Sequence, residues 1–441
     1  MEIAPLKRVA FYTLGCKTNQ YDTEAMQEQF RKHGYTIVDF EADADVYIIN
    51  TCTVTSLSDR KSRQMIRKAH RTNPQAIIAV VGCYAQRASG EVLDIPGVSV
   101  VLGTNDRMNI VDYVEKAYRD RQAVNAVGDI MRVRDFEETP IDFYEGRTRA
   151  ILKIQEGCNQ FCSYCIIPYA RGPVRSRKPD SVKAEVERLA QRGFKEVVLT
   201  GIHIASYGKD LGDRMDLLGL LKLIHDVPGI ERIRLGSLEP NLLTEDFVAA
   251  VRRLPRVCQH YHISLQSGCD ATLRRMYRRY TTGQYREIVD RLRAAMPDVA
   301  VTTDIMTGFP GETEEEFETT LDFVRSIGFS RIHVFQYSPR QGTPAAEYPD
   351  QVPAEVKERR SRSLIRLGHE MEAAYLGRFV GREETVLFEK ECAEKEGYFE
   401  GYTEHYIRVL APAAGDIVNS LHPVRIDKAN GTYLEGTIVY A

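Results

Sequence analysis

Short apolar runs alternate with amphipathic stretches over the first 120 residues of the chain. The apolar runs are rich in β-branched and aromatic residues, which favour strands, and they lie at 8–14, 45–50, 76–81 and 98–102. The stretches 21–33, 58–70 and 109–118 have helical character, and Gly34 ends the first of them. Strands that alternate with helices indicate a parallel sheet with helices on both faces, so residues 1–120 are predicted to form an N-terminal α/β domain.

The alternation weakens at 121–147, where charged residues mix with Pro140 and Gly146, and we predict a linker there. It resumes over 148–376, with predicted strands at 150–157, 196–200, 231–236, 260–265, 300–306 and 331–337. Six β/α units predict a partial TIM-like barrel whose active site faces the carboxyl ends of its strands. Residues 377–441 hold short β-like runs separated by Gly, Asn and Pro, which predict a small antiparallel β-barrel.

Three cysteines, Cys158, Cys162 and Cys165, form a CxxxCxxC loop directly after the predicted strand that begins at Ala150. Thiolates at this spacing can close around one soft metal centre. Three of them satisfy three irons of a 4Fe–4S cube and leave the fourth iron open to a substrate. Zinc is the alternative, but structural zinc normally has four protein ligands, and the next histidine along the chain is His203.

A second set of three cysteines lies in the N-terminal domain. Cys16, Cys52 and Cys83 each fall just past the end of a successive predicted strand. Neighbouring parallel strands lie about 4.8 Å apart, and ligands of such sheets bind beyond the carboxyl ends of the strands. Three loops can therefore bring the thiols together, which predicts a second cluster with an open iron.

Composition and net charge indicate in which compartment these metal sites would form and how the chain could bind RNA. Nine cysteines in 441 residues without an apolar leader argue against a disulfide framework and favour metal binding in the cytoplasm. No apolar run approaches the roughly 20 residues of a membrane span. The net charge of −3 means that RNA binding would need local basic patches. Two candidates are Arg60, Lys61, Arg63, Arg67, Lys68 and Arg71 in one helix, and the run 274–280 with its interleaved tyrosines.

The loop at Cys158 resembles the cluster loop of the radical S-adenosylmethionine (SAM) enzymes, including Tyr164, the aromatic residue before the third thiol. Further motifs lie at 13–17 (TLGCK), 19–21 (NQY), 50–55 (NTCTVT), 82–86 (GCYAQ), 165–172 (CIIPYARG), 175–177 (RSR) and 308–313 (GFPGET). Together they resemble the methylthiotransferases over essentially the whole chain. The C-terminal segment resembles a TRAM domain, the RNA-binding module of this family.

The resemblance implies two 4Fe–4S clusters and SAM as cofactors. The cluster on Cys158, Cys162 and Cys165 would cleave SAM to a 5′-deoxyadenosyl radical, and the cluster on Cys16, Cys52 and Cys83 would carry the sulfur. SAM needs further contacts at strand ends, and the candidates are Thr200, Gly201, Ser237, Glu239, Gln266 and Asp304, together with Tyr164. Each of these also has an ordinary structural interpretation, as a turn residue or helix cap.

The first motif most resembles the branch that modifies N6-threonylcarbamoyladenosine at position 37 of tRNA, next to the anticodon. The expected partners are the tRNA anticodon stem-loop, a reducing electron donor such as flavodoxin or ferredoxin, and a sulfur donor. Two alternatives keep the chemistry and change the substrate, to isopentenyladenosine in tRNA or to an aspartate of a ribosomal protein. A third alternative is a non-catalytic RNA-binding protein with structural iron–sulfur or zinc centres.

Overall fold

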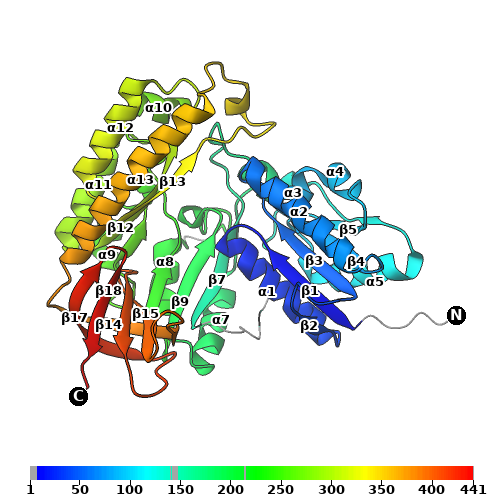
Figure 1. Cartoon of the computed structure of the whole chain (residues 1–441), viewed down its shortest axis with the longest axis horizontal. Coiled ribbons are helices and arrows are strands. Elements are labelled where there is room, and N and C mark those ends of the chain that lie inside the picture. The colour runs from blue at the N-terminus through cyan, green and yellow to red at the C-terminus, as the bar shows by residue number, and fades with distance from the viewer. Residues whose placement is uncertain (1–6, 140, 142–147, 213–214, 441) are drawn as a thin grey trace.

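The computed structural model describes residues 7–139, 141, 148–212 and 215–440, which fold into three units (Figure 1). An α/β unit comes first along the chain, a partial barrel follows it, and a small closed β-barrel ends the chain. This architecture confirms the predicted fold class. None of the described helices is both long and apolar enough to cross a membrane.

The N-terminal sheet has six strands in the order β2-β1-β3-β4-β5-β6, and all neighbours are parallel. The strands are β1 (Arg8–Thr13), β2 (Thr36–Val38), β3 (Val46–Thr51), β4 (Ile77–Gly82), β5 (Val98–Leu102) and β6 (Val124–Asn125). Helices α1 (Lys17–Lys32) and α5 (Ile110–Asp120) pack on one face through Phe30 and Val114. Helices α2 (Ser56–Thr72), α3 (Cys83–Arg87) and α4 (Ser89–Leu93) cover the other. Because alternate strand residues enter the two cores, the sheet is buried on both sides.

The predicted linker is more structured than its composition indicated. Strand β6 lies within it and extends the N-terminal sheet, so that sheet continues past residue 120. Farther on, Arg107 pairs with Glu137, Arg177 donates to Glu138 over 2.8 Å, and Tyr21 donates to the carbonyl of Thr139 over 2.9 Å. The linker therefore binds both units that it joins. Gly146 and Pro140 lie outside the described residues.

The central unit contains six parallel strands, which curve into a partial barrel. They are β7 (Arg149–Glu156), β9 (Glu196–Gly201), β10 (Arg232–Leu235), β11 (His260–His262), β12 (Ala300–Thr307) and β13 (Arg331–Gln336). Single parallel bridges, Ile233 to Val257 and Leu238 to Ile263, connect the half with β7, β9 and β10 to the half with β11, β12 and β13. A two-residue strand that was not predicted, β8 (Arg175–Ser176), pairs antiparallel with β7.

Helices cover the outside of this barrel (Figure 1). They are α7 (Pro179–Gln191), α8 (Leu217–His225), α9 (Glu245–Val251), α10 (Asp270–Arg275), α11 (Thr282–Ala295), α12 (Glu314–Ile327) and α13 (Ala354–Gly377). Helix α6 (Ile167–Arg171) lies instead against the N-terminal unit, where the Thr104 hydroxyl donates to the Ala170 carbonyl over 2.7 Å. Thr313 and Glu316 form the predicted capping box at the start of α12. Loops follow the carboxyl ends of the strands, and the candidate site lies in these loops.

The C-terminal barrel closes in the order β14-β15-β16-β18-β17. Its strands are β14 (Glu383–Glu391), β15 (Tyr398–Thr403), β16 (Arg408–Pro412), β17 (Leu421–Asn430) and β18 (Tyr433–Ile438). The pairing of β16 with β18 is parallel, so the barrel departs from the fully antiparallel prediction at one seam. Two arginines of β10 dock it: Arg232 donates to the Tyr402 carbonyl and Arg234 to the Glu404 carbonyl, each over 2.8 Å.

Candidate active site at the seam of the first two units

The first three thiols follow three adjacent strands of the N-terminal sheet. Thr13 of β1 pairs with Asn50 of β3, and Thr51 pairs with Gly82 of β4, so the three strands end side by side. Cys16 lies just before α1, Cys52 directly after β3 and Cys83 at the start of α3. Cys52 and Cys83 are buried, whereas Cys16 is exposed.

Two asparagines and a glycine hold these strand ends together. The Asn19 amide donates to the carbonyls of Leu14 and Thr51 over 2.6 and 3.1 Å, and the Asn50 amide donates back to the Asn19 carbonyl over 2.9 Å. Gly15 has a positive φ of 106°, and a Cβ there would lie 3.1 Å from the sulfur of Cys52. The motif residues around Cys16 thus fix the relative positions of two cysteine loops.

The second three thiols occupy one loop after β7. Gly157 begins the loop at a φ of +74°, where any Cβ would collide with the Pro173 carbonyl. The Cys158 N–H donates to the Gly172 carbonyl over 3.0 Å, and the Cys165 N–H donates to the Cys162 carbonyl over 2.9 Å. These bonds hold the segment that carries the three cysteines in a compact loop directly before α6.

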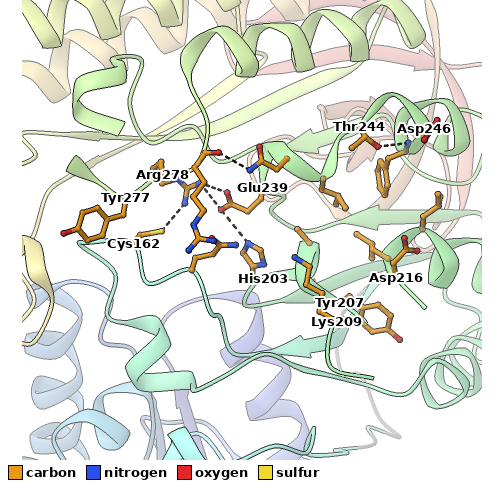
Figure 2. A pocket seen from close by; sticks show the side chains of 18 residues that line it. Cys162, His203, Tyr207, Lys209, Asp216, Glu239, Thr244, Asp246, Tyr277 and Arg278 are labelled. Atoms are coloured by element: carbon orange, nitrogen blue, oxygen red, sulfur yellow. Dashed lines mark hydrogen bonds and ion pairs between the residues drawn. The ribbon is translucent and has the colours of Figure 1, made fainter. Parts of the chain in front are cut away.

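The sulfurs of this loop accept hydrogen bonds. The backbone N–H of Gln160 donates to the Cys158 sulfur over 3.4 Å, and the Arg278 guanidinium donates to the Cys162 sulfur over 3.4 Å. Figure 2 shows Arg278 between Cys162 and Glu239, with its guanidinium 2.9 Å from the Glu239 carboxylate. His203 lies 3.8 Å from the same carboxylate.

These residues border a cavity of about 550 Å³, the first cavity, which is large enough for a small-molecule cofactor. Its lining includes Cys162, Gln160, His203, Glu239 and Arg278. Of the residues predicted to contact SAM, Glu239 therefore lies beside the cluster loop.

A second cavity, of about 640 Å³, is lined by residues of all three units. Ser237 and Asp304 line it, and the Asp304 carboxylate lies 3.3 Å from His262. Thr200, Gly201 and Gln266 are outside both linings. Gln266 has a left-handed backbone with φ 68°, and its backbone pairs with β12. Tyr164 packs edge-on against Phe309, outside both linings. The predicted SAM contacts are thus divided among two cavities, nearby strand ends and the cluster loop, and contact with SAM stays a prediction for each of them.

The two cysteine sets are joined through Arg171 of α6. Its Nε donates to the Cys83 sulfur over 3.1 Å, and its Nη1 donates to Asp22 and to Glu156 over 2.9 Å each. The next residue, Gly172, accepts the Cys158 N–H. One helix end therefore contacts a thiol of the first set and the loop of the second.

The charges around Arg171 form a buried cluster at the seam. Lys153 lies 2.5 Å from Asp22 and 3.1 Å from Glu156, and Arg107 lies 3.2 Å from Asp22. Opposite charges this close stabilise the ionised forms, so the pKa of Asp22 and of Glu156 is lowered although burial alone would raise it. The seam is held by ion pairs in a low-dielectric setting, where separating one partner is unfavourable.

A second contact joins the first two units at the start of α2. Arg340, in the segment after β13, lies 2.5 Å from Asp59 and donates to the Thr53 hydroxyl over 2.7 Å. Ser338 and Ser56 hydroxyls lie 3.2 Å apart. The N-terminal unit is therefore tied to the central unit by two separate sets of contacts, one at α6 and one near Cys52.

The residues present fit two iron–sulfur clusters. Burial raises the pKa of Cys158 to about 11 and of Cys165 to about 12, and burial raises that of Cys83 to about 12 although Arg171 opposes it. Metal coordination deprotonates such thiols, and the N–H donors at the sulfurs of Cys83, Cys158 and Cys162 stabilise thiolate charge. Within the described ranges, no three His, Cys, Asp or Glu side chains are arranged to hold a single ion; each thiolate of a cube has its own iron.

Sequence reasoning missed the roles of Arg171 and Arg278. Arg278 was assigned to an RNA-binding run, but it is buried against Glu239 and Cys162, and Arg275 of the same run pairs with Glu316. Arg274, Tyr277 and Arg279 of the run remain exposed, so RNA contact stays a prediction for these three residues. Arg171 was seen only as part of a motif, and its burial could not be inferred without the fold.

Comparisons with known proteins cover nearly the whole chain. Residues 8–103 match the family described as uncharacterized protein family UPF0004, and residues 152–324 match the radical SAM superfamily. A Bacillus subtilis relative named threonylcarbamoyladenosine tRNA methylthiotransferase MtaB is 44% identical over 98% of this chain and 96% of its own. A Thermotoga maritima relative of the same name is 38% identical over 96% and 94%.

A relative from Pelotomaculum thermopropionicum, named tRNA-2-methylthio-N(6)-dimethylallyladenosine synthase, is 35% identical over 99% of this chain and 98% of its own. Among solved structures, the radical S-adenosylmethionine methyltransferase TsrM from Kitasatospora setae aligns with a TM-score of 0.57 at 16% identity. That alignment covers 78% of this chain and 77% of TsrM, and it shows a shared fold. The chain belongs to the radical SAM methylthiotransferase family, and within it resembles the threonylcarbamoyladenosine tRNA methylthiotransferase (MtaB) branch.

Proposed function

We propose that this enzyme adds a methylthio group to carbon 2 of N6-threonylcarbamoyladenosine at position 37 of tRNA. The names of two relatives that match nearly the full chain support this substrate. The observation that carries the proposal is the joining of two three-cysteine sets through Arg171 and Gly172. A reaction that moves sulfur to a carbon radical needs its radical source and its sulfur carrier within reach of one substrate atom.

The family uses SAM and two 4Fe–4S clusters, and each cysteine set fits one cluster. When bound, the cluster on Cys158, Cys162 and Cys165 supplies the electron that cleaves SAM, and that on Cys16, Cys52 and Cys83 carries the sulfur to be methylated. An electron donor such as flavodoxin or ferredoxin and a sulfur donor complete the reaction.

The protein side chains orient and shield these groups. Gln160 and Arg278 place N–H donors on the sulfurs of the radical-forming set, and Arg171 does so for Cys83. Glu239 borders the first cavity beside Cys162, where its carboxylate could bind the ammonium or ribose hydroxyls of SAM. Burial of Cys83, Cys158 and Cys162 limits access of water to the reacting centre.

Nucleoside analysis tests the substrate. Transfer RNA from cells that lack this gene should lose the 2-methylthio derivative of threonylcarbamoyladenosine and keep its unmethylthiolated form, as measured by mass spectrometry. Loss of the 2-methylthio dimethylallyl nucleoside instead would favour the activity named for the Pelotomaculum relative. Unchanged tRNA together with loss of methylthiolation on a ribosomal protein would favour the protein substrate.

A matched pair of variants tests the division of roles. Cys158→Ala should abolish 5′-deoxyadenosine formation from SAM while leaving methylation of the sulfur carrier intact. Cys83→Ala should do the reverse, with 5′-deoxyadenosine still formed and no methylthiolated product. Formation of 5′-deoxyadenosine by the Cys158→Ala protein would show that the roles have been assigned to the wrong sets.

A further inference from the structure

The second cavity is lined by side chains of all three units of the protein, and one of them, Lys17, directly follows Cys16 in the sequence. The N-terminal unit contributes Lys17, the partial barrel contributes His262 and Phe335, and the C-terminal barrel contributes Tyr406 and Arg408. Its volume of about 640 Å³ is in the range of nucleoside-sized pockets. A substrate base that reaches the first cysteine set can therefore be surrounded by side chains from every unit.

Lys17 differs from the other basic residues of this lining. Arg331 lies 3.7 Å from Glu372, and Arg408 lies 2.7 Å from Glu400. Among the described residues, no carboxylate lies within ion-pair distance of the Lys17 ammonium, which lies 5.8 Å from the centre of the Tyr406 ring. The cavity thus contains an ammonium group that a bound anion could neutralise.

The position of Lys17 in its helix reinforces this point. It is the first residue of α1, and the first turn of that helix contains no acidic residue. A cation is unfavourable at this end because the helix dipole is positive there. The combined positive charge of the helix end and the ammonium favours an anionic ligand beside Cys16.

The chemistry of the proposed substrate supplies such an anion. The threonylcarbamoyl group on N6 ends in a carboxylate, whereas a dimethylallyl group carries no charge. In adenine, C2 and C6 are both bonded to N1, so the N6 substituent lies on the part of the ring next to C2. A residue adjoining a ligand of the sulfur-carrying cluster is therefore well placed to contact that substituent when C2 is presented to the cluster.

An aromatic side chain supports the base-binding interpretation of the same cavity. Phe335 of β13 lines it and is 51% exposed, which is unusual for a phenylalanine in a barrel wall. Exposed aromatic rings of this kind stack on unpaired bases in RNA-binding proteins. The lining thus offers a stacking surface and an unpaired ammonium group within one cavity.

We propose that Lys17 binds the carboxylate of the N6-threonylcarbamoyl group in the second cavity and so selects this nucleoside over neutral N6-modified adenosines. This inference rests on the proposed function. A hydrogen bond between charged groups is worth about 1.5–3 kcal/mol, which is about tenfold to a hundredfold in affinity. Neutralising either partner should remove that advantage.

The test uses holoenzyme with both clusters and two synthetic anticodon stem-loops, one with threonylcarbamoyladenosine and one with its methyl ester. Wild-type protein should bind and methylthiolate the acid about tenfold to a hundredfold better than the ester. Lys17→Ala should lose this discrimination, and Lys17→Arg should restore part of it. Lys32→Ala, at the other end of α1, should discriminate like the wild type, since Lys32 pairs with Glu28 there.

The possible results distinguish a failure of the proposed role of Lys17 from a failure of the proposed function. A Lys17→Ala protein that still prefers the acid over the ester, or that holds less iron than the wild type, would overturn the role of Lys17 in substrate selection. The second result would place Lys17 in cluster assembly instead. Failure of the wild type to act on either stem-loop would contradict the proposed function itself, and the inference would fall with it.

Discussion

The guanidinium of Arg171 donates a hydrogen bond to the sulfur of Cys83 over 3.1 Å, although the two residues belong to different units of the protein. The same guanidinium contacts Asp22 and Glu156. Glu156 ends the strand that leads into Cys158, so one side chain connects the sulfur-carrying site, the N-terminal helix and the radical-forming loop. Of the three cations in this buried cluster, Arg171 is the one that also contacts a cysteine sulfur.

Replacing Arg171 with Ala should destabilise the seam by about 1.5–3 kcal/mol, because Asp22 and Glu156 lose one of the three buried cations that they share, while Lys153 and Arg107 remain. The Arg171→Lys variant keeps the charge but loses the forked geometry of the guanidinium. Its stability should therefore lie between that of the wild type and that of Arg171→Ala. Urea unfolding measures the loss. Arg188→Ala, on the exposed side of α7, is the matched control and should change stability by less than about 0.5 kcal/mol. An Arg171→Ala protein as stable as that control would refute this account of the seam.

Gly15→Ala should empty the first cluster site while sparing the second. The new Cβ would lie 3.0 Å from the Cβ and 3.1 Å from the sulfur of Cys52, and the backbone there has a φ of 106° that alanine adopts poorly. Iron analysis after anaerobic reconstitution should fall from about eight to about four irons per chain. Gly90→Ala, in open space on α4, should keep the full iron content. Full loading of Gly15→Ala would show that Cys52 can move away from the first loop.

The exposed basic face of α2 should contribute to the salt dependence of tRNA binding. Arg60, Lys61, Arg67 and Arg71 all point to solvent, whereas Arg63 pairs with Glu91 and Lys68 with Glu41. Changing the four exposed residues to Gln should reduce the slope of log affinity against log salt by about three, if each contacts one phosphate of the loop.

The matched control for that experiment changes Arg286 and Arg325 to Gln. These residues lie on α11 and α12, across the barrel from the N-terminal unit (Figure 1). Their loss should leave the slope unchanged. An equal reduction by both sets of substitutions would indicate a general charge effect and no specific binding face on α2.

The strand-end placement of all six cysteines followed from apolar runs that stop at glycine or threonine, because such runs form parallel strands whose ends share one edge. Strands β2, β6 and β8 were missed because runs of two or three residues carry no periodicity. The parallel pairing of β16 with β18 is set by barrel closure, which local sequence does not encode.

The polar residues between the sites were harder to predict. Arg278 stands in a run of arginines and tyrosines that is typical of an exposed basic surface, and only its contact with Glu239, 39 residues away in sequence, shows that it is buried. The cluster of Arg171, Asp22 and Arg107 combines three separate segments in the same way. Ion pairs of this kind depend on tertiary contacts, so single-sequence patterns do not reveal them.

Glu196 should make docking of the C-terminal barrel sensitive to acid. Its carboxylate lies 2.6 Å from Arg234, which in turn donates to the Glu404 carbonyl of that barrel. Burial opposes ionisation, but the Arg234 guanidinium outweighs it and lowers the pKa of Glu196. The unfolded chain, with a glutamate pKa of about 4.3, takes up the proton first. Stability is therefore present above that value and is lost as pH falls below it towards the lower pKa of the folded state.

The Glu196→Gln variant tests this directly. It should be less stable at neutral pH by about 3–5 kcal/mol, because Arg234 is left buried without its counter-ion. Its stability should also fall less steeply than that of the wild type between about pH 5 and pH 3, as followed by urea unfolding. Glu187→Gln, on the exposed face of α7, should reproduce the wild-type profile. If the Glu196→Gln protein kept the wild-type dependence of stability on pH, the ion pair between Glu196 and Arg234 would not contribute to that dependence. Other carboxylates would then govern the acid sensitivity of docking.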